Sequence, residues 1–123
     1  MLPIRVAFDG HSYPFTLLSM AKLIFGERIS KTGKLATGCA GILFDEKSER
    51  ILLTRRTDNG RWCLPGGRME VGEGIAEACE REFWEETGLR VQTVRLIGVY
   101  SDPHLVVEYA DGNRWQYVSL FLR

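Results

Sequence analysis

The sequence predicts an α+β fold, in which a mixed β-sheet carries helices on its faces. One long stretch with helical periodicity, residues 74–87, lies between several short apolar or alternating stretches that are typical of strands. These strands do not alternate regularly with helices, as the strands of a doubly wound parallel sheet do. The length of 123 residues fits a single domain, and a hydrophobic content of 45% is ordinary for a globular protein.

The composition argues against several classes of protein. Sixteen basic and sixteen acidic residues give zero net charge, so no general electrostatic surface for nucleic acid or membrane is indicated. A nucleotide substrate needs only a local site. The three cysteines, Cys39, Cys63 and Cys79, lack CxxC spacing, which argues against a zinc site or a disulfide framework and favours a reducing cytoplasm. No signal peptide or bilayer-spanning stretch is indicated.

Residues 1–34 are expected to be an N-terminal extension. Residues 4–8 alternate weakly before an Asp-Gly turn signal, which allows a small strand or hairpin. Residues 15–25 place apolar side chains at helical spacing before a glycine, so we predict a short helix there. Two roles for this helix stay open, because it can cover a face or edge of the main sheet or form a homodimer contact. Residues 27–34 are polar and are expected to be a linker.

Residues 35–123 contain the predicted sheet. Residues 35–57 are predicted to form a hairpin, with a glycine-rich apolar strand, a charged turn and an apolar return strand. A turn signal and a short apolar piece then lead into a loop at Gly66 and Gly67, where the backbone allows close approach of a ligand or metal. Later strands are predicted over residues 90–100, 105–109 and 115–122, the last two forming a hairpin about residues 111–113.

The predicted helix has one apolar face. Ile75, Cys79 and Phe83 recur at i, i+4 and i+8 and are joined by two alanines, so these residues are expected to face the core. Gly88 follows as a suitable C′ residue that ends the helix.

Three glutamates of the same helix form the most unusual feature of the chain. Glu82, Glu85 and Glu86 stand at i, i+3 and i+4, so a helix places them on one face, where like charges repel. Arg81 is correctly spaced to compensate Glu85, but Glu82 has no basic residue three or four positions away, and Glu86 has none before Gly88 stops the helix. Carboxylate oxygens are the ligands that hard cations prefer, so the cluster predicts a divalent metal site. From the charges alone, the alternative is a solvated helix face.

The spacing across this region resembles the Nudix box. The family pattern is Gly, five residues, Glu, seven residues, then Arg-Glu-apolar-any-Glu-Glu-any-Gly-apolar. Phe83 stands where the family more often has an aliphatic residue, and the position stays apolar. Nine specified positions over 23 residues make the match highly specific. The nine specified positions are filled by Gly67, Glu73, Arg81, Glu82, Phe83, Glu85, Glu86, Gly88 and Leu89, and the two unspecified positions after Phe83 and Glu86 are Trp84 and Thr87.

The flanking segments resemble, more loosely, the ADP-ribose pyrophosphatase-like group of this family. These segments are LLTRRTDNGRWCLPGG before the box, and YSDP and YADGNRWQYVSLFLR after it. The resemblance covers about residues 35–123 and implies a Nudix-like α/β/α sandwich with a mixed sheet. Such a sheet usually has a helix against its second face. Either the N-terminal helix serves there or a C-terminal helix is missing from this chain.

The resemblance also implies a chemistry. Family members hydrolyse nucleoside diphosphates linked to another moiety and use Mg²⁺ or Mn²⁺. Carried over by position, Glu82, Glu85 and Glu86 bind the metal, and the backbone of Gly66 and Gly67 borders it. A pyrophosphate repels attacking water, and divalent ions held by carboxylates neutralise its charge and activate bound water, which agrees with this assignment.

The resemblance further implies that Glu73 pairs with Arg81 and braces the loop against the helix. A carboxylate at Glu73 is also favoured by its place near the helix N-terminus. Glu70, in the preceding loop, is either a further ligand or an exposed residue.

Substrate contacts are expected outside the helix. Arg55 and Arg56 end a predicted strand just before the candidate phosphate site, although arginines there are more often ordinary surface residues. Trp62 can stack on a base or pack under the loop, and packing is the more common role. Tyr100 and Trp115 are core candidates by the same reasoning.

The general base is not identified by the sequence. Glu108 and His104 lie in a region where family members often place a catalytic base or substrate contacts, but that location varies among them. A metal-dependent hydrolase of ADP-ribose or a nucleotide sugar is the first expectation. A triphosphate pyrophosphohydrolase for oxidised nucleotides is the second. A non-catalytic nucleotide sensor is the third, and the intact box carboxylates argue against it.

Overall fold

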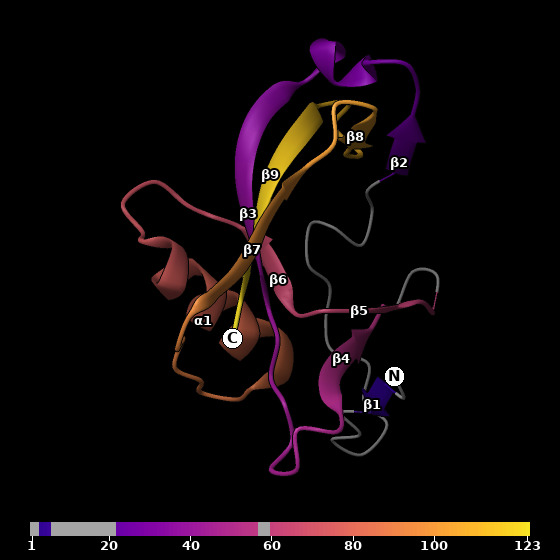
Figure 1. Cartoon of the computed structure of the whole chain (residues 1–123). Coiled ribbons are helices and arrows are strands. Elements are labelled where there is room, and N and C mark those ends of the chain that lie inside the picture. Colours follow the sequence, from indigo (N-terminus) through magenta and orange to yellow (C-terminus); the bar gives the residue numbers. More distant parts are fainter. Residues whose placement is uncertain (1–2, 6–21, 57–59) are drawn as a thin grey trace.

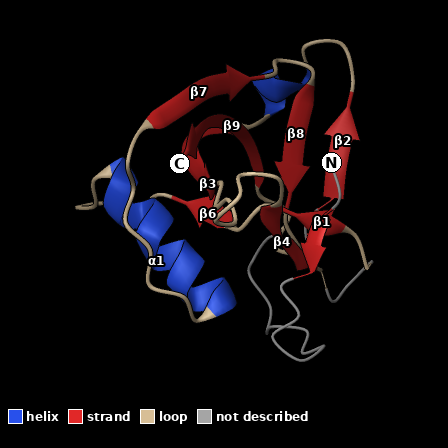
Figure 2. Ribbon diagram, turned by 60° about the horizontal axis from the view of Figure 1, so that its bottom comes forward, coloured by secondary structure: helices blue, strands red, loops and turns tan. Residues whose placement is uncertain are grey.

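The computed structural model describes residues 3–5, 22–56 and 60–123. The described chain forms one α-helix, one 3₁₀ helix and nine strands, arranged as Figures 1 and 2 show. In chain order these are β1 (Pro3–Arg5), β2 (Lys22–Phe25), η2 (Ile29–Thr32), β3 (Lys34–Gly41), β4 (Ile51–Arg55), β5 (Trp62–Cys63), β6 (Gly66–Arg68), α1 (Ile75–Thr87), β7 (Leu96–Ser101), β8 (Leu105–Glu108) and β9 (Arg114–Leu122).

The larger sheet is mixed, as predicted. Its strand order is β2-β8-β9-β3-β6, and β7 pairs with β9 beyond the end of β8. Strand β9 is parallel to β3 along its length, and the other pairings in this sheet are antiparallel. A smaller sheet has the order β1-β4-β5. The helix α1 lies against one side of the curved larger sheet (Figure 2), which confirms the α+β class.

The core lies between α1 and the larger sheet. Ala78 and Cys79 of α1 are buried against Cys39 of β3 and Leu122 of β9, and Ile75 packs at the edge of this cluster. Phe83 is fully buried, and a Cβ atom at position 41 would lie 2.7 Å from its ring, so β3 needs glycine there. The predicted core face of the helix is therefore confirmed.

Local signals set the two ends of α1. Gly74 is the N-cap residue, and its N–H donates to the Glu77 carboxylate at 2.7 Å. Gly88 adopts a left-handed conformation (φ 73°), and its N–H donates to the carbonyl of Trp84 at 2.8 Å. The helix ends where the sequence predicts because a left-handed residue interrupts it at little cost only when that residue is glycine.

The predicted hairpin over residues 35–57 is correct only around its turn. Phe44 bridges Ile51, and the Asp45 N–H donates to the carbonyl of Arg50 at 3.0 Å. Beyond this turn, β3 and β4 enter different sheets. Strand β3 pairs with β9 on one side and with β6 on the other, so neither of its edges is left for β4. Sequence proximity alone does not reveal this competition.

The helix predicted over residues 15–25 is wrong at its C-terminal end. Lys22–Phe25 forms β2, which pairs with Leu105–Glu108 of β8. Residues 15–21 lie outside the described residues. The small strand expected near residue 4 is present as β1, parallel to β4, and η2 interrupts the expected linker. The division of the chain at residues 34 and 35 stays a prediction.

Two further predictions are corrected. Gly66 and Gly67 form part of strand β6 rather than a loop, because they pair with Ala40 and Cys39 of β3. The strand predicted over residues 90–100 begins only at Leu96. Side-chain and chain-end contacts hold the preceding segment instead: the Thr93 N–H donates to Glu80 at 2.7 Å, and two more backbone N–H groups donate to the Arg123 carbonyl.

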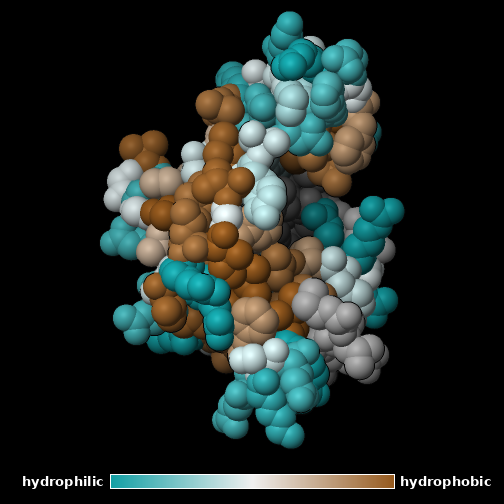
Figure 3. All heavy atoms as spheres, viewed as in Figure 1, coloured by the Kyte–Doolittle hydropathy of each residue, from teal (hydrophilic) through white to brown (hydrophobic). Residues whose placement is uncertain are grey.

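Strand β7 presents exposed apolar side chains. Leu96, Ile97, Val99 and Tyr100 are between 44% and 63% exposed, and brown surface gathers along this strand in Figure 3. Cover for the sheet by an N-terminal helix, a C-terminal helix or a second copy stays a prediction. The described part of the chain has no helix that is long and apolar enough to cross a membrane.

Candidate functional site

Arg81 of α1 joins the helix to the segment that precedes it. Its Nη2 donates to Glu73 at 3.0 Å, and its Nε donates to the other oxygen of the same carboxylate. The pair expected between these residues is therefore present. The fork of the guanidinium matches the carboxylate, so the pKa of Glu73 is lowered and that of Arg81 is raised. Nη2 also donates to the Arg68 carbonyl at 3.2 Å, which ties α1 to β6.

The third nitrogen of Arg81 compensates two of the helix glutamates. Nη1 lies 2.9 Å from Glu82 Oε1 and 3.3 Å from Glu85 Oε2. Glu70 Oε1 lies farther away, at 3.9 Å, and this side chain is largely exposed. The prediction that Glu82 lacks local compensation is therefore wrong. A long arginine side chain reaches its immediate neighbour in sequence, a contact that the three- and four-residue spacing rule does not include.

Glu82 is held tightly against β6. Its residue is 8% exposed, and a Cβ atom at Gly67 would lie 2.5 Å from the carboxyl carbon of Glu82. Only glycine leaves room for this approach. Burial raises the pKa of Glu82, while the hydrogen bond from Arg81 opposes the increase.

Glu86 is the other buried carboxylate. It is 8% exposed and accepts the Gly66 N–H at 3.2 Å. No ion-pair partner of Glu86 is present in the described part of the chain. Burial, followed by the negative charge of Glu82, raises the pKa of Glu86 to about 8. In this state the carboxyl group is therefore largely protonated at neutral pH.

The donor set fits a hard divalent cation. Glu82, Glu85 and Glu86 offer carboxylate oxygens, and a nearby cation would reverse the cost of burying Glu86 in its charged form. As they stand, no three acidic, histidine or cysteine side chains of the described residues are close enough together to hold a metal. Arg81 instead bridges Glu82 and Glu85. The Glu85 side chain is 52% exposed, so it is free to leave Arg81.

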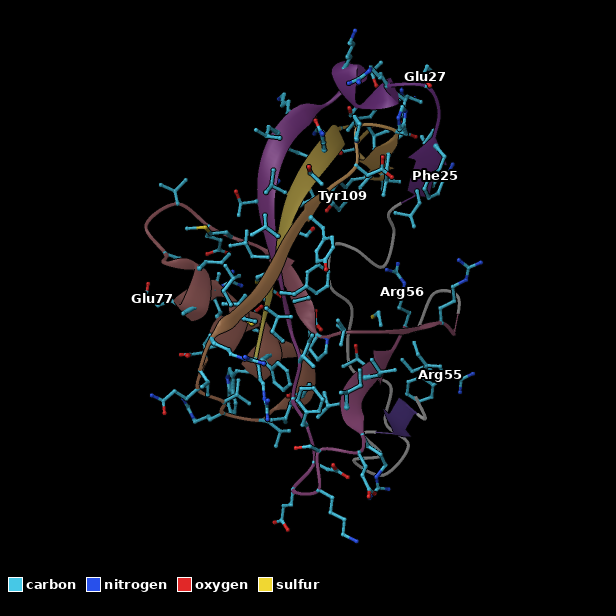
Figure 4. The ribbon with its side chains drawn as sticks, viewed as in Figure 1. Phe25, Glu27, Arg55, Arg56, Glu77 and Tyr109 are labelled. Carbon is cyan, nitrogen blue, oxygen red and sulfur yellow. The ribbon has the colours of Figure 1, made fainter. Side chains whose placement is uncertain are left out.

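The arginines predicted to contact substrate lie on the β4–β5 strand pair. Arg55 and Arg56 are on the side of the molecule opposite Glu77 of α1 in Figure 4. The Arg55 Nε donates to the carbonyl of Gly60 at 3.1 Å, and its guanidinium lies 5.9 Å from the centre of the Trp62 ring. Trp62 is 38% exposed, so it is not packed away beneath the loop. Their role toward substrate stays a prediction.

The two candidate bases have other partners. His104 Nδ1 accepts the Arg28 N–H at 2.9 Å, and the Glu108 carboxylate accepts from Arg114 at 2.8 Å. Tyr100 is 63% exposed and contacts Phe121 edge to face, so it is not the core residue that the sequence suggested.

The comparison with protein families decides the identity of this arrangement. The model described as "NUDIX domain" matches residues 34–123. The chain belongs to the NUDIX family. The box assigned from the sequence accounts for β6, α1 and the segment between them.

Several curated NUDIX relatives share about half of the chain. A MutT-like protein of Streptomyces ambofaciens is 48% identical over 51% of this chain and 40% of its own length. An ADP-ribose pyrophosphatase of Methanocaldococcus jannaschii is 49% identical over 47% of this chain and 36% of its own. A putative 8-oxo-dGTP diphosphatase of Bacillus subtilis is 44% identical over 52% of this chain and 43% of its own length. The matches thus span less than half the length of these relatives.

Solved NUDIX structures agree with the fold. A NUDIX hydrolase from Nitrosomonas europaea is 26% identical, with a TM-score of 0.54 over 72% of this chain and 58% of that chain. A MutT protein from Methanosarcina mazei is also 26% identical, with a TM-score of 0.53 over 72% of this chain and 63% of that chain. The mixed sheet with α1 on one side is therefore the NUDIX arrangement.

We expect Arg81→Lys to cost about 1 to 3 kcal/mol of unfolding free energy in the NUDIX domain. A lysine ammonium cannot reproduce the paired hydrogen bonds to Glu73 and also reach Glu82 and the Arg68 carbonyl. Urea unfolding of the protein in EDTA measures the loss. Arg50→Lys is the matched control: Arg50 is 58% exposed and pairs with Asp45, so we expect less than about 1 kcal/mol. Equal losses in the two variants would contradict this central role of Arg81.

Proposed function

We propose that this chain is a metal-dependent hydrolase that cleaves the pyrophosphate bond of a nucleoside diphosphate derivative, using Mg²⁺ or Mn²⁺. ADP-ribose or a nucleotide sugar is the favoured substrate. The observation that carries the proposal is the pair of buried carboxylates, Glu82 and Glu86, enclosed by the glycines of β6. Burying two acidic groups side by side is unfavourable unless a cation offsets their charge.

The metal would be held by Glu82, Glu85 and Glu86, next to the Gly67 backbone. When bound, such an ion supplies charge neutralisation for the diphosphate and a more acidic water. The protein's own groups fix the geometry. The Gly66 N–H orients Glu86, and Arg81 holds Glu82 while bracing it against Glu73. These contacts place the carboxylates before substrate arrives, which lowers the reorganisation needed during reaction.

The relatives support the reaction type more than the substrate. One is named an ADP-ribose pyrophosphatase and another a putative 8-oxo-dGTP diphosphatase, at similar identities. Hydrolysis of oxidised nucleoside triphosphates is therefore the second candidate. A purely sensing domain is disfavoured, because all the box carboxylates are present. Homodimerisation and a cytoplasmic location also stay predictions.

A hydrolysis screen tests the proposal. The protein is incubated with Mg²⁺ or Mn²⁺ and with ADP-ribose, nucleotide sugars, dinucleoside polyphosphates or (deoxy)nucleoside triphosphates, and the products are separated by ion-exchange chromatography. We expect two phosphorylated products from a diphosphate derivative, and none when EDTA is added. Release of inorganic pyrophosphate from triphosphates alone would favour the second candidate. No turnover of any substrate would favour the sensor.

A further inference from the structure

An aromatic residue on the far face of the sheet has two positively charged neighbours. The Arg68 guanidinium lies 4.8 Å from the centre of the Trp115 ring, and the Lys34 ammonium lies 5.7 Å from it. Neither cation forms an ion pair within the described part of the chain. Arg68 also influences the nearby Asp111, whose pKa is lowered mainly by hydrogen bonds from Asn113. The indole therefore lies beside two positive charges that form no ion pair within the described part of the chain.

Strand geometry puts this group on the face away from α1. Side chains alternate between the two faces along a strand. Leu120 and Leu122 of β9 pack against the α1 cluster, so Trp115 and Tyr117 face the opposite side. The same alternation in β6 places Gly67 toward Glu82 and Arg68 away from it.

Arg68 connects the two faces. Its carbonyl accepts a hydrogen bond from Arg81 at 3.2 Å, so its backbone belongs to the acidic site, while its side chain covers Trp115. Strand β6 is at the end of the strand order, so no strand separates the two faces along this edge. A ligand whose diphosphate lies at the carboxylates can therefore extend around β6 toward Trp115.

Two further aromatic side chains lie near Trp115 on the same strand pair. Tyr109 and Tyr117 share a hydrogen bond between their hydroxyl groups, and burial raises the pKa of Tyr117. Aromatic rings bind bases by stacking, and cations bind phosphates, so the combination suits a nucleotide.

We propose that Trp115, flanked by Arg68 and Lys34, is the surface on which the nucleobase end of the substrate stacks. This assignment rests on the proposed function for its diphosphate end. The base lies against the indole, and Arg68 and Lys34 attract the phosphate nearest the nucleoside. Arg68 is released from the ring when a base takes its place, and then turns toward that phosphate.

Kinetics with matched tryptophan variants tests the assignment. With the substrate found in the screen, we expect Trp115→Leu to raise KM roughly tenfold or more, as for loss of one base–aromatic stack, with kcat within about threefold. Trp115→Phe retains a ring and is expected to recover most of the affinity. Trp84→Leu is the control, because Trp84 is 45% exposed on α1 and also carries an arginine, Arg90, 4.4 Å from its ring centre. An unchanged KM in Trp115→Leu would overturn the assignment.

Fluorescence tests the surface without turnover. In a Trp62→Phe/Trp84→Phe background, Trp115 is the remaining tryptophan. We expect AMP to quench its emission and ribose 5-phosphate to leave it unchanged. Equal quenching by both would overturn base stacking in favour of phosphate contact alone, and no quenching by AMP would also overturn the assignment. Quenching by AMP without hydrolysis of any substrate would support the stacking surface and refute the hydrolase, so the two proposals fail separately.

Discussion

Glu86→Gln is expected to lower kcat by about 10²- to 10³-fold, the size of effect seen when one preorganised charge-stabilising group is removed. The amide oxygen still accepts the Gly66 N–H, which lies 3.2 Å from Glu86 Oε2, so the backbone of β6 keeps its place. What the variant loses is a negative charge at the proposed metal site. The measurement is kcat with saturating Mg²⁺ or Mn²⁺ on the substrate from the screen.

The same substitution is expected to stabilise the protein in EDTA. Burial raises the pKa of Glu86 from 4.5 to about 8, so the folded protein keeps a proton that the unfolded chain releases between these pH values. Stability from this group is complete below pH 4.5 and is lost as the pH rises through about 8. The loss is at most about 1.4 kcal/mol per pH unit.

Thermal unfolding between pH 5 and 8 therefore separates the two proteins. We expect Glu86→Gln to have the higher Tm at pH 8, by an amount that shrinks toward pH 5. Glu80→Gln is the matched control, because Glu80 on the same helix also accepts a backbone N–H, from Thr93 at 2.7 Å, and lies outside the acidic site. It is expected to keep wild-type kcat. Wild-type activity in Glu86→Gln, or a Tm difference independent of pH, would refute the role given to Glu86.

Alanine at the two glycines of β6 is expected to have two different effects. A Cβ atom at Gly66 would lie 2.0 Å from the backbone oxygen of Cys39, and a strand backbone cannot move away without breaking the β3–β6 pairing. We expect Gly66→Ala to cost about 3 kcal/mol or more, or to prevent folding. At Gly67 the obstacle is the side chain of Glu82, at 2.5 Å, which can rotate.

Gly67→Ala is therefore expected to fold and to lose activity. Displacing one carboxylate by about 1 Å is enough to cost about 10²-fold in rate. Urea unfolding and kcat are measured for both variants, with Gly26→Ala as the control, where a Cβ atom would make ordinary contacts with Ile29 at 3.4 Å and beyond. A larger stability loss at Gly67 than at Gly66 would contradict these assignments.

The parts of the fold that depend on local signals were predictable from the sequence. The helix α1 was predicted to within one residue at its start, because its apolar spacing and its two glycine ends are adjacent in sequence. The hairpin of β8 and β9 was predicted for the same reason, since its turn at residues 111–113 directly joins the two strands.

Competition between distant segments was not predictable in this way. Residues 22–25 have helical spacing, but they form β2 because β8, more than 75 residues away, offers a strand edge. Gly66 and Gly67 were predicted to form a loop, but they pair with Ala40 and Cys39 at the edge of β3. In the site, the spacing of Glu82, Glu85 and Glu86 gave the metal hypothesis. The contacts of Arg81, and the approach of Arg68 to Trp115, depend on packing between elements. The sequence signal that could have drawn attention to Arg68 is its position directly after Gly66 and Gly67.

The alternation of side chains in β6 has a consequence for how this chain can vary. Gly67 and Arg68 are separated by one peptide bond, yet they serve opposite faces of the sheet. One residue inserted or deleted between β5 and β6 could shift the register of β6 by one position. Gly67 and Arg68 would then exchange faces, and an arginine side chain would lie where the Glu82 carboxylate is. The segment between β6 and α1 does not alternate in this way, but its length is fixed by the Glu73 carboxylate, which must reach Arg81. Length changes are therefore expected to be excluded on both sides of β6.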